Sequence, residues 1–465
     1  GKAVTYYRTR FEVTEAMMER GALFLRFKGV DYKAHVFVNG AYLDSHEGFF
    51  APFEVEFTRH AHPGENTLLV KVENDAICMG NASWGADGKS FEGDKIYAAT
   101  GPGYDDPEVG WHHCPPGMGI YQDVFVEARA SLFIHDIFVR PMVEETRAEA
   151  WIEVWNCDKY RKNIGLELSV YGQNFRATVF RDRAFPVSQA MGPGVNYFRL
   201  SFDMPTDRLW DLDAPWLYQL QAKLADEKGR LQDISARPFG MRSFCMDEES
   251  EPRGRMILNN REIRLRGANT MGHLQQCVIK KDWDQLRDDL LLAKICNMNF
   301  LRFTQRPVQP EIYEYCDRLG MMTQTDLPLF AVLRRNQFCE DVRQAEEMER
   351  LIRAHPCNIM VSYINEPCPN ANGNPRRHLT RTELEGFFRA ADEVIRLQNP
   401  DRVIKPVDGD YDPPADGLPD NHCYCGWYNG HGLDLGRLHK GYWQHVKPGW
   451  MVGCGEFGAE GLDPV

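Results

Sequence analysis

The hydrophobic pattern changes its period near Arg255, and this change constrains the fold more than any other feature of the sequence. Before it, segments such as "GALFLRFKGV" and "NTLLVKVEN" alternate apolar and polar residues, as strands of half-exposed sheets do. After it, short apolar runs alternate with longer ones whose apolar residues recur about every three or four positions, as in amphipathic helices. The chain therefore divides into an all-β part and a part in which strands and helices alternate.

The all-β part itself separates into two segments. In the first, Asn39-Gly40 joins two strand-like runs, and this pair is typical of a two-residue hairpin because both turn positions need a positive φ. The second holds short strand-like runs separated by turn residues at regular spacing, which is the pattern of a β-sandwich. We predict a first domain over residues 1–130 and a second over residues 131–248.

Residues 249–465 form the predicted α/β domain. Its apolar run "NIMVSYI" is typical of a strand buried on both faces of a sheet. Thr380 and Glu383 form a capping box at the start of one helix, and Gly320 is placed to end an earlier one. Repeated βα units predict a parallel sheet, with a (β/α)8 TIM barrel favoured and a doubly wound sheet as the alternative.

Composition excludes several classes of function. The 465 residues include 67 acidic and 54 basic ones, and the net charge of −13 argues against binding to nucleic acid. No uncharged apolar run is long enough to cross a membrane, and neither a dinucleotide-binding fingerprint nor a Walker A motif occurs. The 13 cysteines are scattered and none forms a C-x-x-C pair, so we expect reduced thiols and a cytoplasmic protein.

Two glutamates stand at the ends of predicted strands. Glu366 follows the apolar strand in "VSYINEP", and Glu456 ends another in "WMVGCGEFG". In a barrel of this kind the carboxyl ends of the strands form the face where active sites lie. Two carboxyl groups brought together there can hydrolyse a glycosidic bond, one as acid and the other as nucleophile or base. The alternative is that each glutamate is an ion-pair member or a helix-capping neighbour.

The segments "SYINEP" and "GEFG" resemble the acid/base and nucleophile segments of glycoside hydrolase family 2, which includes β-galactosidases, β-glucuronidases and β-mannosidases. The order of the chain is similar as well, since "GIYQDVFVEA" resembles the end of the family's first domain and "FGMRSF" the end of its second. The resemblance implies a jelly-roll sugar-binding domain, an immunoglobulin-like β-sandwich and a TIM barrel. Against that pattern the first domain lacks its opening strands and the barrel is incomplete at its C-terminus. We therefore expect a fragment, a processed form or a chain that needs a partner.

Carried over residue by residue, the resemblance implies a retaining double displacement. Glu366 would protonate the leaving oxygen, and an ionised Glu456 would attack the anomeric carbon. Asn365 would hydrogen-bond the sugar 2-hydroxyl. The other residues expected to bind substrate, for which a place in the barrel core or on its rim is the alternative, are Arg302, Tyr424, His273, Asp326 and Trp427.

Two clusters of histidine and cysteine, "WHHC" at residues 111–114 and "HCYC" at residues 422–425, bear on metal binding. Neither has the C-x2–4-C or H-x3–5-H spacing of structural zinc sites. We therefore predict no cofactor. The resemblance allows a magnesium or sodium ion near the site, but no residue pattern locates one, and a metal-dependent hydrolase using these clusters is the alternative that a chelator would test.

The resulting hypothesis is a retaining exo-β-glycosidase that removes terminal, non-reducing β-linked sugars. β-Galactosidase is the first choice, with β-glucuronidase or β-mannosidase as alternatives. The expected partners are an oligosaccharide or glycoside substrate and a second copy of the chain in a homo-oligomer, without nucleic acid or membrane. A non-catalytic carbohydrate-binding protein or fragment is the alternative from another class, and it would hold sugar without turnover.

Overall fold

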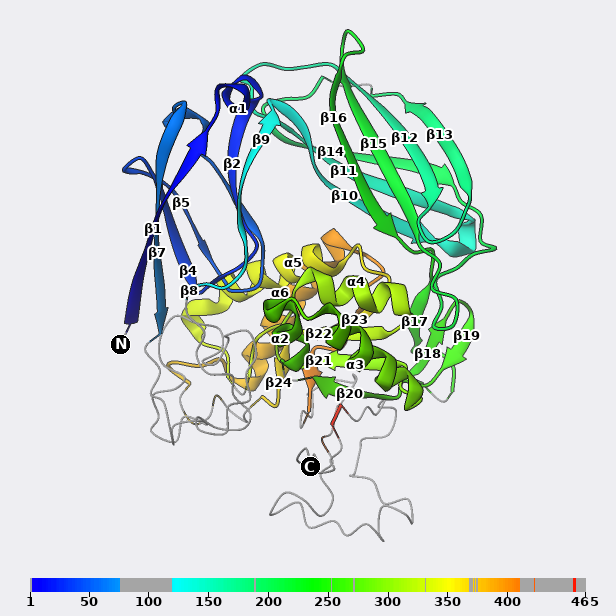
Figure 1. Cartoon of the computed structure of the whole chain (residues 1–465). Helices are drawn as coiled ribbons and strands as arrows, with labels where there is room; N and C mark the ends of the chain where they lie inside the picture. Colours follow the sequence, from blue (N-terminus) through cyan, green and yellow to red (C-terminus); the bar gives the residue numbers. More distant parts are fainter. Residues whose placement is uncertain are drawn as a thin grey trace.

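Three parts follow one another along the chain in the computed structural model (Figure 1). The first two consist of β-sheets, and the third packs helices around a parallel sheet. Among the described helices, none combines the length and the apolar character needed to cross a membrane. The structure describes residues 2–75, 119–187, 190–251, 253–270, 272–330, 332–367, 371, 373, 375–409, 422 and 455–456.

The first part contains a four-stranded and a three-stranded antiparallel sheet. Its elements are β1 (Lys2–Val13), α1 (Glu15–Glu19), β2 (Gly21–Phe27), β3 (Val30–Asp31), β4 (Lys33–Val38), β5 (Ala41–Glu47), β6 (Phe53–Glu56), η1 (Thr58–His60), β7 (Gly64–Asp75), β8 (Gly119–Ile120) and β9 (Val124–Ala130). The sheets have the orders β1-β7-β4-β5 and β6-β2-β9. Asn39 and Gly40, with φ of 50° and 82°, connect β4 to β5, which confirms the predicted hairpin.

The second part is a sandwich of two antiparallel sheets, with the orders β10-β11-β14 and β13-β12-β15-β16. Its elements are β10 (Leu132–Met142), η2 (Val143–Glu145), β11 (Arg147–Asn156), β12 (Ile164–Gly172), β13 (Thr178–Phe185), β14 (Gly194–Asp203), β15 (Tyr218–Asp226) and β16 (Leu231–Phe239). Along β15 buried and half-buried residues alternate, so the two-residue period of the sequence becomes the inner face of the sandwich. A small sheet of β17 (Phe244–Asp247), β18 (Arg255–Leu258) and β19 (Arg261–Ile263) leads into the third part.

The third part has a parallel sheet of order β20-β21-β22-β23-β25, with a further parallel pair, β24-β26. The strands are β20 (Gly267–Thr270), β21 (Phe300–Phe303), β22 (Met322–Asp326), β23 (Asn358–Ser362), β24 (Ile364–Asn365), β25 (Val403–Ile404) and β26 (Val407–Asp408). The helices are α2 (His273–Lys280), α3 (Trp283–Ile295), α4 (Pro310–Leu319), η3 (Arg335–Gln337), α5 (Phe338–Ile352) and α6 (Arg381–Gln398).

Local signals in the third part behave as predicted. Every residue of β23 is buried, as predicted for a strand that is covered on both faces of the sheet. Thr380 and Glu383 form the capping box of α6. Gly320 ends α4 in a left-handed conformation, with φ of 68°. Neighbouring residues thus determine where these elements begin and end. The strands of the sheet are parallel, so their carboxyl ends lie along one edge.

A chain of ion pairs links all three parts. Arg129 on β9 donates to both carboxylate oxygens of Glu54, at 2.7 and 2.6 Å. His135 on β10 lies between two carboxylates, with Nε2 3.5 Å from Glu54 Oε2 and Nδ1 3.1 Å from Glu153 Oε2. Arg350 on α5 donates to both oxygens of Glu153, at 2.7 and 2.9 Å. Two acidic and two basic groups thus surround a histidine where the parts meet.

The contribution of His135 to the free energy of unfolding is expected to fall as the pH rises to about 9. Burial lowers the pKa of His135, but hydrogen bonds to Glu153 and Glu54 raise it more, to about 9. A pKa above that of the unfolded chain, about 6.5, means that the charged imidazole stabilises the fold below pH 6.5 and that this contribution is lost near pH 9. His135→Gln should therefore lower the free energy of unfolding by roughly 1–3 kcal/mol at pH 6, and the deficit should shrink above pH 9.

Urea unfolding at a series of pH values measures this difference. His60→Gln, which changes an exposed histidine in η1, is the control and should follow the wild type throughout. A deficit for His135→Gln that stays constant from pH 6 to pH 10 would contradict the prediction.

Candidate active site

Strand ends of the parallel sheet bring polar side chains to one edge. Arg302 lies on β21, Asp326 ends β22, Asn365 ends β24 and Asp408 ends β26. Glu366 directly follows Asn365 and has a φ of 46°, a conformation that residues other than glycine rarely adopt. Its backbone N–H donates to the carbonyl of Asp408 at 2.9 Å. Unusual backbone of this kind is common at functional sites, where the surroundings hold it in place.

Arg302 lies at the centre of the cluster, with only 2% of its side chain exposed. Its Nε and Nη2 donate to Asp326 Oδ2 at 2.9 and 2.6 Å, and Nη2 also donates to Asn365 Oδ1 at 2.7 Å. Its Nη1 lies 2.8 Å from Glu456 Oε1 and 2.7 Å from Asp408 Oδ1. Because the donors of a guanidinium have a fixed planar geometry, this one side chain sets the positions of four others.

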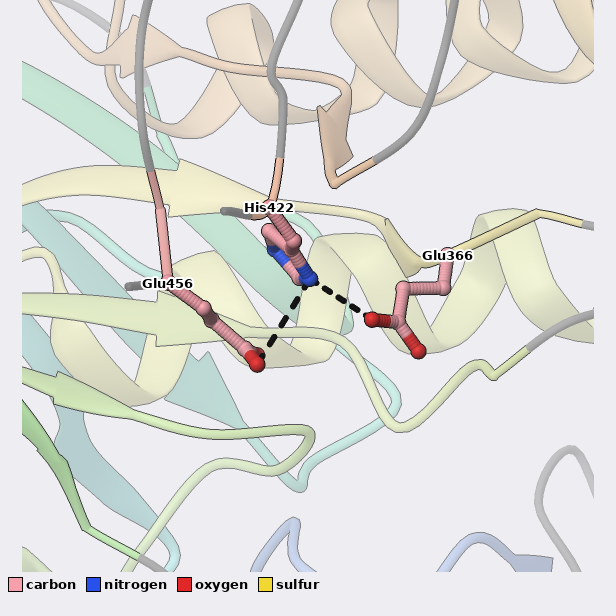
Figure 2. Close-up of side chains that lie close together, drawn as sticks. All are labelled: Glu366, His422 and Glu456. Carbon is pink, nitrogen blue, oxygen red and sulfur yellow. Dashed lines mark hydrogen bonds and ion pairs between the residues drawn. The ribbon is translucent and has the colours of Figure 1, made fainter. Parts of the chain in front are cut away.

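His422 connects the two glutamates. Its ring lies between their carboxylates in Figure 2, with Nδ1 2.6 Å from Glu366 Oε1 and 3.5 Å from Glu456 Oε2. Its Nε2 lies 3.1 Å from Asp408 Oδ1. Burial lowers the pKa of His422, but hydrogen bonds to Asp408 and Glu366 and the charge of Glu456 raise it to about 10. The contacts of the ring with Glu366, Asp408 and Glu456 thus favour its protonated form.

The two glutamates have different surroundings. The side chain of Glu366 is 27% exposed, whereas that of Glu456 is 12% exposed and contacts Arg302. Burial raises the pKa of Glu456, and the charges of Glu366 and Asp408 raise it further, against the opposing effect of Arg302 and His422. One oxygen of each glutamate and one nitrogen of His422 all lie within 4.8 Å of one another. The site therefore holds two close carboxyl groups with a shared cation.

The same three side chains have the donor types that hold a metal ion. A metal ligand must be a neutral imidazole with a free lone pair. His422 instead has hydrogen-bonding carboxylates at both nitrogens, which favour its protonated form. The arrangement of Glu366, His422 and Glu456 thus fits a hydrogen-bonded cluster better than a metal centre.

The structure brings together five of the residues singled out from the sequence, namely Glu366, Glu456, Asn365, Arg302 and Asp326. His273 does not join them: it begins α2 with an exposed side chain, and no hydrogen bond or ion pair of that side chain occurs in the described part of the chain. Tyr424 and Trp427 lie outside the described residues.

Two members of the cluster, Asp408 and His422, were missed by the sequence analysis. Asp408 ends the strand in "RVIKPVD", so the strand-end rule that found Glu366 could also have found it. In the sequence, His422 was considered only as a possible metal ligand together with Cys423 and Cys425. Its contacts with three carboxylates come from the fold and have no counterpart in the local sequence.

Gly409 provides the space that His422 occupies. A Cβ atom at Gly409 would lie 2.3 Å from Cε1 of the His422 ring, and the glycine has a φ of 91°. Gly64 has the same φ of 91°, but a Cβ atom there would meet nothing within 4 Å, which makes it a matched control. Gly409→Ala should lower the free energy of unfolding by about 1–3 kcal/mol more than Gly64→Ala, because only the first adds overpacking to the shared backbone strain. If urea unfolding gives the same loss in free energy of unfolding for Gly409→Ala and Gly64→Ala, the His422 ring can move to make room for the methyl group at little cost.

Sequence comparison agrees with this geometry. Residues 2–96, 132–242 and 252–430 match, in order, families described as "Glycosyl hydrolase 2 galactose-binding domain-like", "Glycosyl hydrolases family 2" and "Glycosyl hydrolases family 2, TIM barrel domain". The chain belongs to glycoside hydrolase family 2. This confirms the predicted architecture of β-sandwich domains followed by a TIM-barrel domain, and the doubly wound alternative falls away.

Individual relatives of this family 2 chain are distant. A β-galactosidase of Halalkalibacterium halodurans is 24% identical over 307 residues, which cover 65% of this chain and 26% of that protein. The crystal structure of Bacteroides uniformis β-glucuronidase superposes with a TM-score of 0.70 at 19% identity, covering 95% of this chain and 51% of the other. A β-galacturonidase from Eisenbergiella tayi bound to galacturonate gives a TM-score of 0.67 at 20% identity, covering 91% and 68%. The chain thus spans about a quarter of the curated relative and half of the glucuronidase.

Proposed function

We propose that this protein is a retaining exo-β-glycosidase in which Glu456 is the nucleophile and Glu366 the acid/base. The observation that supports this most is the close approach of the two glutamates at the carboxyl edge of the sheet, where one oxygen of each lies within 4.8 Å of the other. Retaining glycosidases hold their carboxyl groups about 5–5.5 Å apart, whereas inverting ones leave about 6.5–9.5 Å for a water molecule. Membership of family 2 supports the same class of reaction.

Each side chain of the cluster has a part in this proposal. The Glu456 carboxylate attacks the anomeric carbon, with Arg302 at 2.8 Å fixing the orientation of the attacking group. Glu366 gives its proton to the leaving oxygen and later removes one from water, and its partial exposure suits a group that exchanges protons with solvent. Because the Asn365 carbonyl oxygen accepts from Arg302, its amide nitrogen is left to donate to the sugar 2-hydroxyl.

Among the described residues, the cations that contact Asp408 are already paired, which favours a neutral sugar over a uronate. Arg302, His422 and Lys405 are each paired with a carboxylate of the chain, the last through Asp408 at 2.6 Å. A uronate would need a cation of its own for its carboxylate. We therefore infer a β-galactoside as the first substrate, in line with the name of the curated relative, with a β-glucuronide or β-mannoside as alternatives.

A panel of p-nitrophenyl β-glycosides tests the function: galactoside, glucuronide, mannoside and glucoside. We expect release from the galactoside, with the β-anomer of the sugar as the first product seen by proton NMR. Hydrolysis of the glucuronide instead of the galactoside would contradict the proposed substrate but would still support a glycosidase. An initial α-anomer would overturn the retaining mechanism. Sugar binding without turnover by the well-folded protein would favour the carbohydrate-binding alternative.

A further inference from the structure

A cavity of about 340 Å³ lies between the second sandwich and the barrel. Its walls come from the end of β10 with η2, from residues 239–245, and from the segments that precede β23 and β25. We call it the junction cavity. The glutamates lie beyond the carboxyl ends of the sheet, so this cavity is at the opposite edge from the proposed active site. Its volume is in the range of small-molecule sites.

Arg242 is a wall residue of the junction cavity that lacks a carboxylate partner. Its Nε donates to the carbonyl of Pro356 at 2.8 Å and its Nη2 to the carbonyl of Asn358 at 2.9 Å, so the guanidinium is held in place. Among the described residues, no carboxylate forms a hydrogen bond or ion pair with it, and Nη1 makes no hydrogen bond. A fixed cation with a free donor therefore borders the cavity.

The acidic groups near Arg242 already have partners. Asp317 accepts from the backbone of Cys357 at 2.9 Å and contacts the His355 ring at 2.6 Å. Asp401 accepts from Nε and Nη2 of Arg140, at 2.6 and 2.7 Å. Burial and the charge of Arg402 lower the pKa of Arg242 to about 10, against the opposing charges of Asp317 and Asp401. The Arg242 residue is half-buried, and an anion beside its free Nη1 would form a charge-assisted hydrogen bond with it.

The other walls define the rest of the ligand. Arg353 also lines the cavity, but its Nη1 already donates to Gln398 at 2.7 Å and its Nη2 to Asp136 at 2.6 Å. The acidic wall residues Glu144 and Glu145 are exposed, and the Glu144 carboxylate accepts from Asn260 at 2.9 Å. The apolar wall residues include Phe138, Val139, Met142, Phe239, Phe244 and Pro356. The cationic donor of Arg242 beside apolar walls matches a ligand with a charged end and an apolar body.

We propose that the junction cavity binds a small organic carboxylate, with the carboxylate group on Arg242 and the apolar body against the walls. Such a ligand would join the second sandwich to the barrel, because both supply the walls. Binding to the folded state alone also raises its stability, so the midpoint of thermal unfolding should rise with ligand concentration.

Isothermal titration calorimetry of the full chain with benzoate tests this proposal. We expect one binding site, and we expect benzamide, the neutral isostere, to bind at least about tenfold more weakly. Arg242→Gln should weaken benzoate binding by a similar factor. Arg181→Gln, which changes an exposed arginine on β13 outside the cavity, should leave the affinity unchanged.

A second variant guards against a folding defect, because Arg242→Gln also breaks the bonds to Pro356 and Asn358. Met142→Trp fills the cavity from its wall, keeps Arg242 and should abolish benzoate binding. Circular dichroism confirms the folded state of each variant. Absence of benzoate binding in the wild type, or binding that survives both variants, overturns the site. Inorganic phosphate binding as tightly as benzoate overturns the assignment to an organic anion.

Discussion

Replacing Glu456 with glutamine is expected to lower kcat for an aryl β-glycoside by about 10⁴-fold or more. Glutamine keeps the shape of the side chain, and its carbonyl oxygen can still accept from Arg302, as the Glu456 carboxylate does at 2.8 Å. The amide is not a nucleophile, so the glycosyl-enzyme cannot form. KM should change little, because the contacts that bind the sugar remain. Initial rates with p-nitrophenyl β-galactoside measure both constants.

Glu366→Gln is the matched control for this prediction. A 2,4-dinitrophenyl leaving group departs with little help from an acid, whereas p-nitrophenol needs more. Glu366→Gln should therefore lose much less activity toward the dinitrophenyl substrate, and Glu456→Gln should lose activity toward both equally. Turnover by Glu456→Gln that stays within about tenfold of the wild type would rule out Glu456 as the nucleophile.

The second large effect concerns stability. Arg302→Met should lower the free energy of unfolding by about 3–5 kcal/mol, because it leaves buried carboxylates without their shared cation. Asp326 and Asp408 are almost fully buried, and Glu456 is largely so. The charges of Arg302 and Lys405 outweigh burial and hold the pKa of Asp408 well below its usual range. Without Arg302, the folded variant holds the charged form of Asp408 less favourably, so the pKa of Asp408 rises. The loss in free energy of unfolding should therefore become smaller at lower pH, where Asp408 takes up a proton.

Urea unfolding at pH 7 and pH 5 measures the deficit of Arg302→Met. The control is Arg140→Met, which breaks the Arg140–Asp401 pair, where 26% and 49% of the two side chains are exposed. An exposed pair contributes only about 0–1 kcal/mol, so this variant should remain near the wild type. Equal losses in free energy of unfolding for Arg302→Met and Arg140→Met would mean that other groups neutralise the charge of the buried carboxylates.

Much of the fold follows from local patterns. The two-residue period predicted the strands of the sandwich. Asn39-Gly40 predicted the hairpin between β4 and β5, and the capping box of Thr380 and Glu383 predicted the start of α6. These signals work because each depends on residues that are neighbours in the sequence or along one face of an element. The strand-end rule likewise identified Glu366, since the apolar strand before it is unmistakable.

The rest of the site depends on contacts between distant segments. Asp408 ends a two-residue strand, Val407–Asp408, that follows a proline, and its sequence shows little of the strand pattern. His422 contacts Glu366, 56 positions away, through a part-buried hydrogen bond that nothing in "HCYC" encodes. His273 was chosen as a strand-end residue, but β20 ends at Thr270 and the chain has already entered α2 at position 273. Local patterns locate strands, whereas packing decides which strand ends meet.

The contacts of Arg302 also bear on the order in which the protein folds. Its partners Asp326, Asn365 and Glu456 lie 24, 63 and 154 positions along the chain. Closing longer loops costs more entropy, and contacts between distant segments slow folding. In refolding, helical signal and the Arg302–Asp326 pair can therefore return before Glu456 is in place. Recovery of the proposed glycosidase activity would mark the final step of folding, and its delay behind the helical signal would give the time that Glu456 takes to reach Arg302.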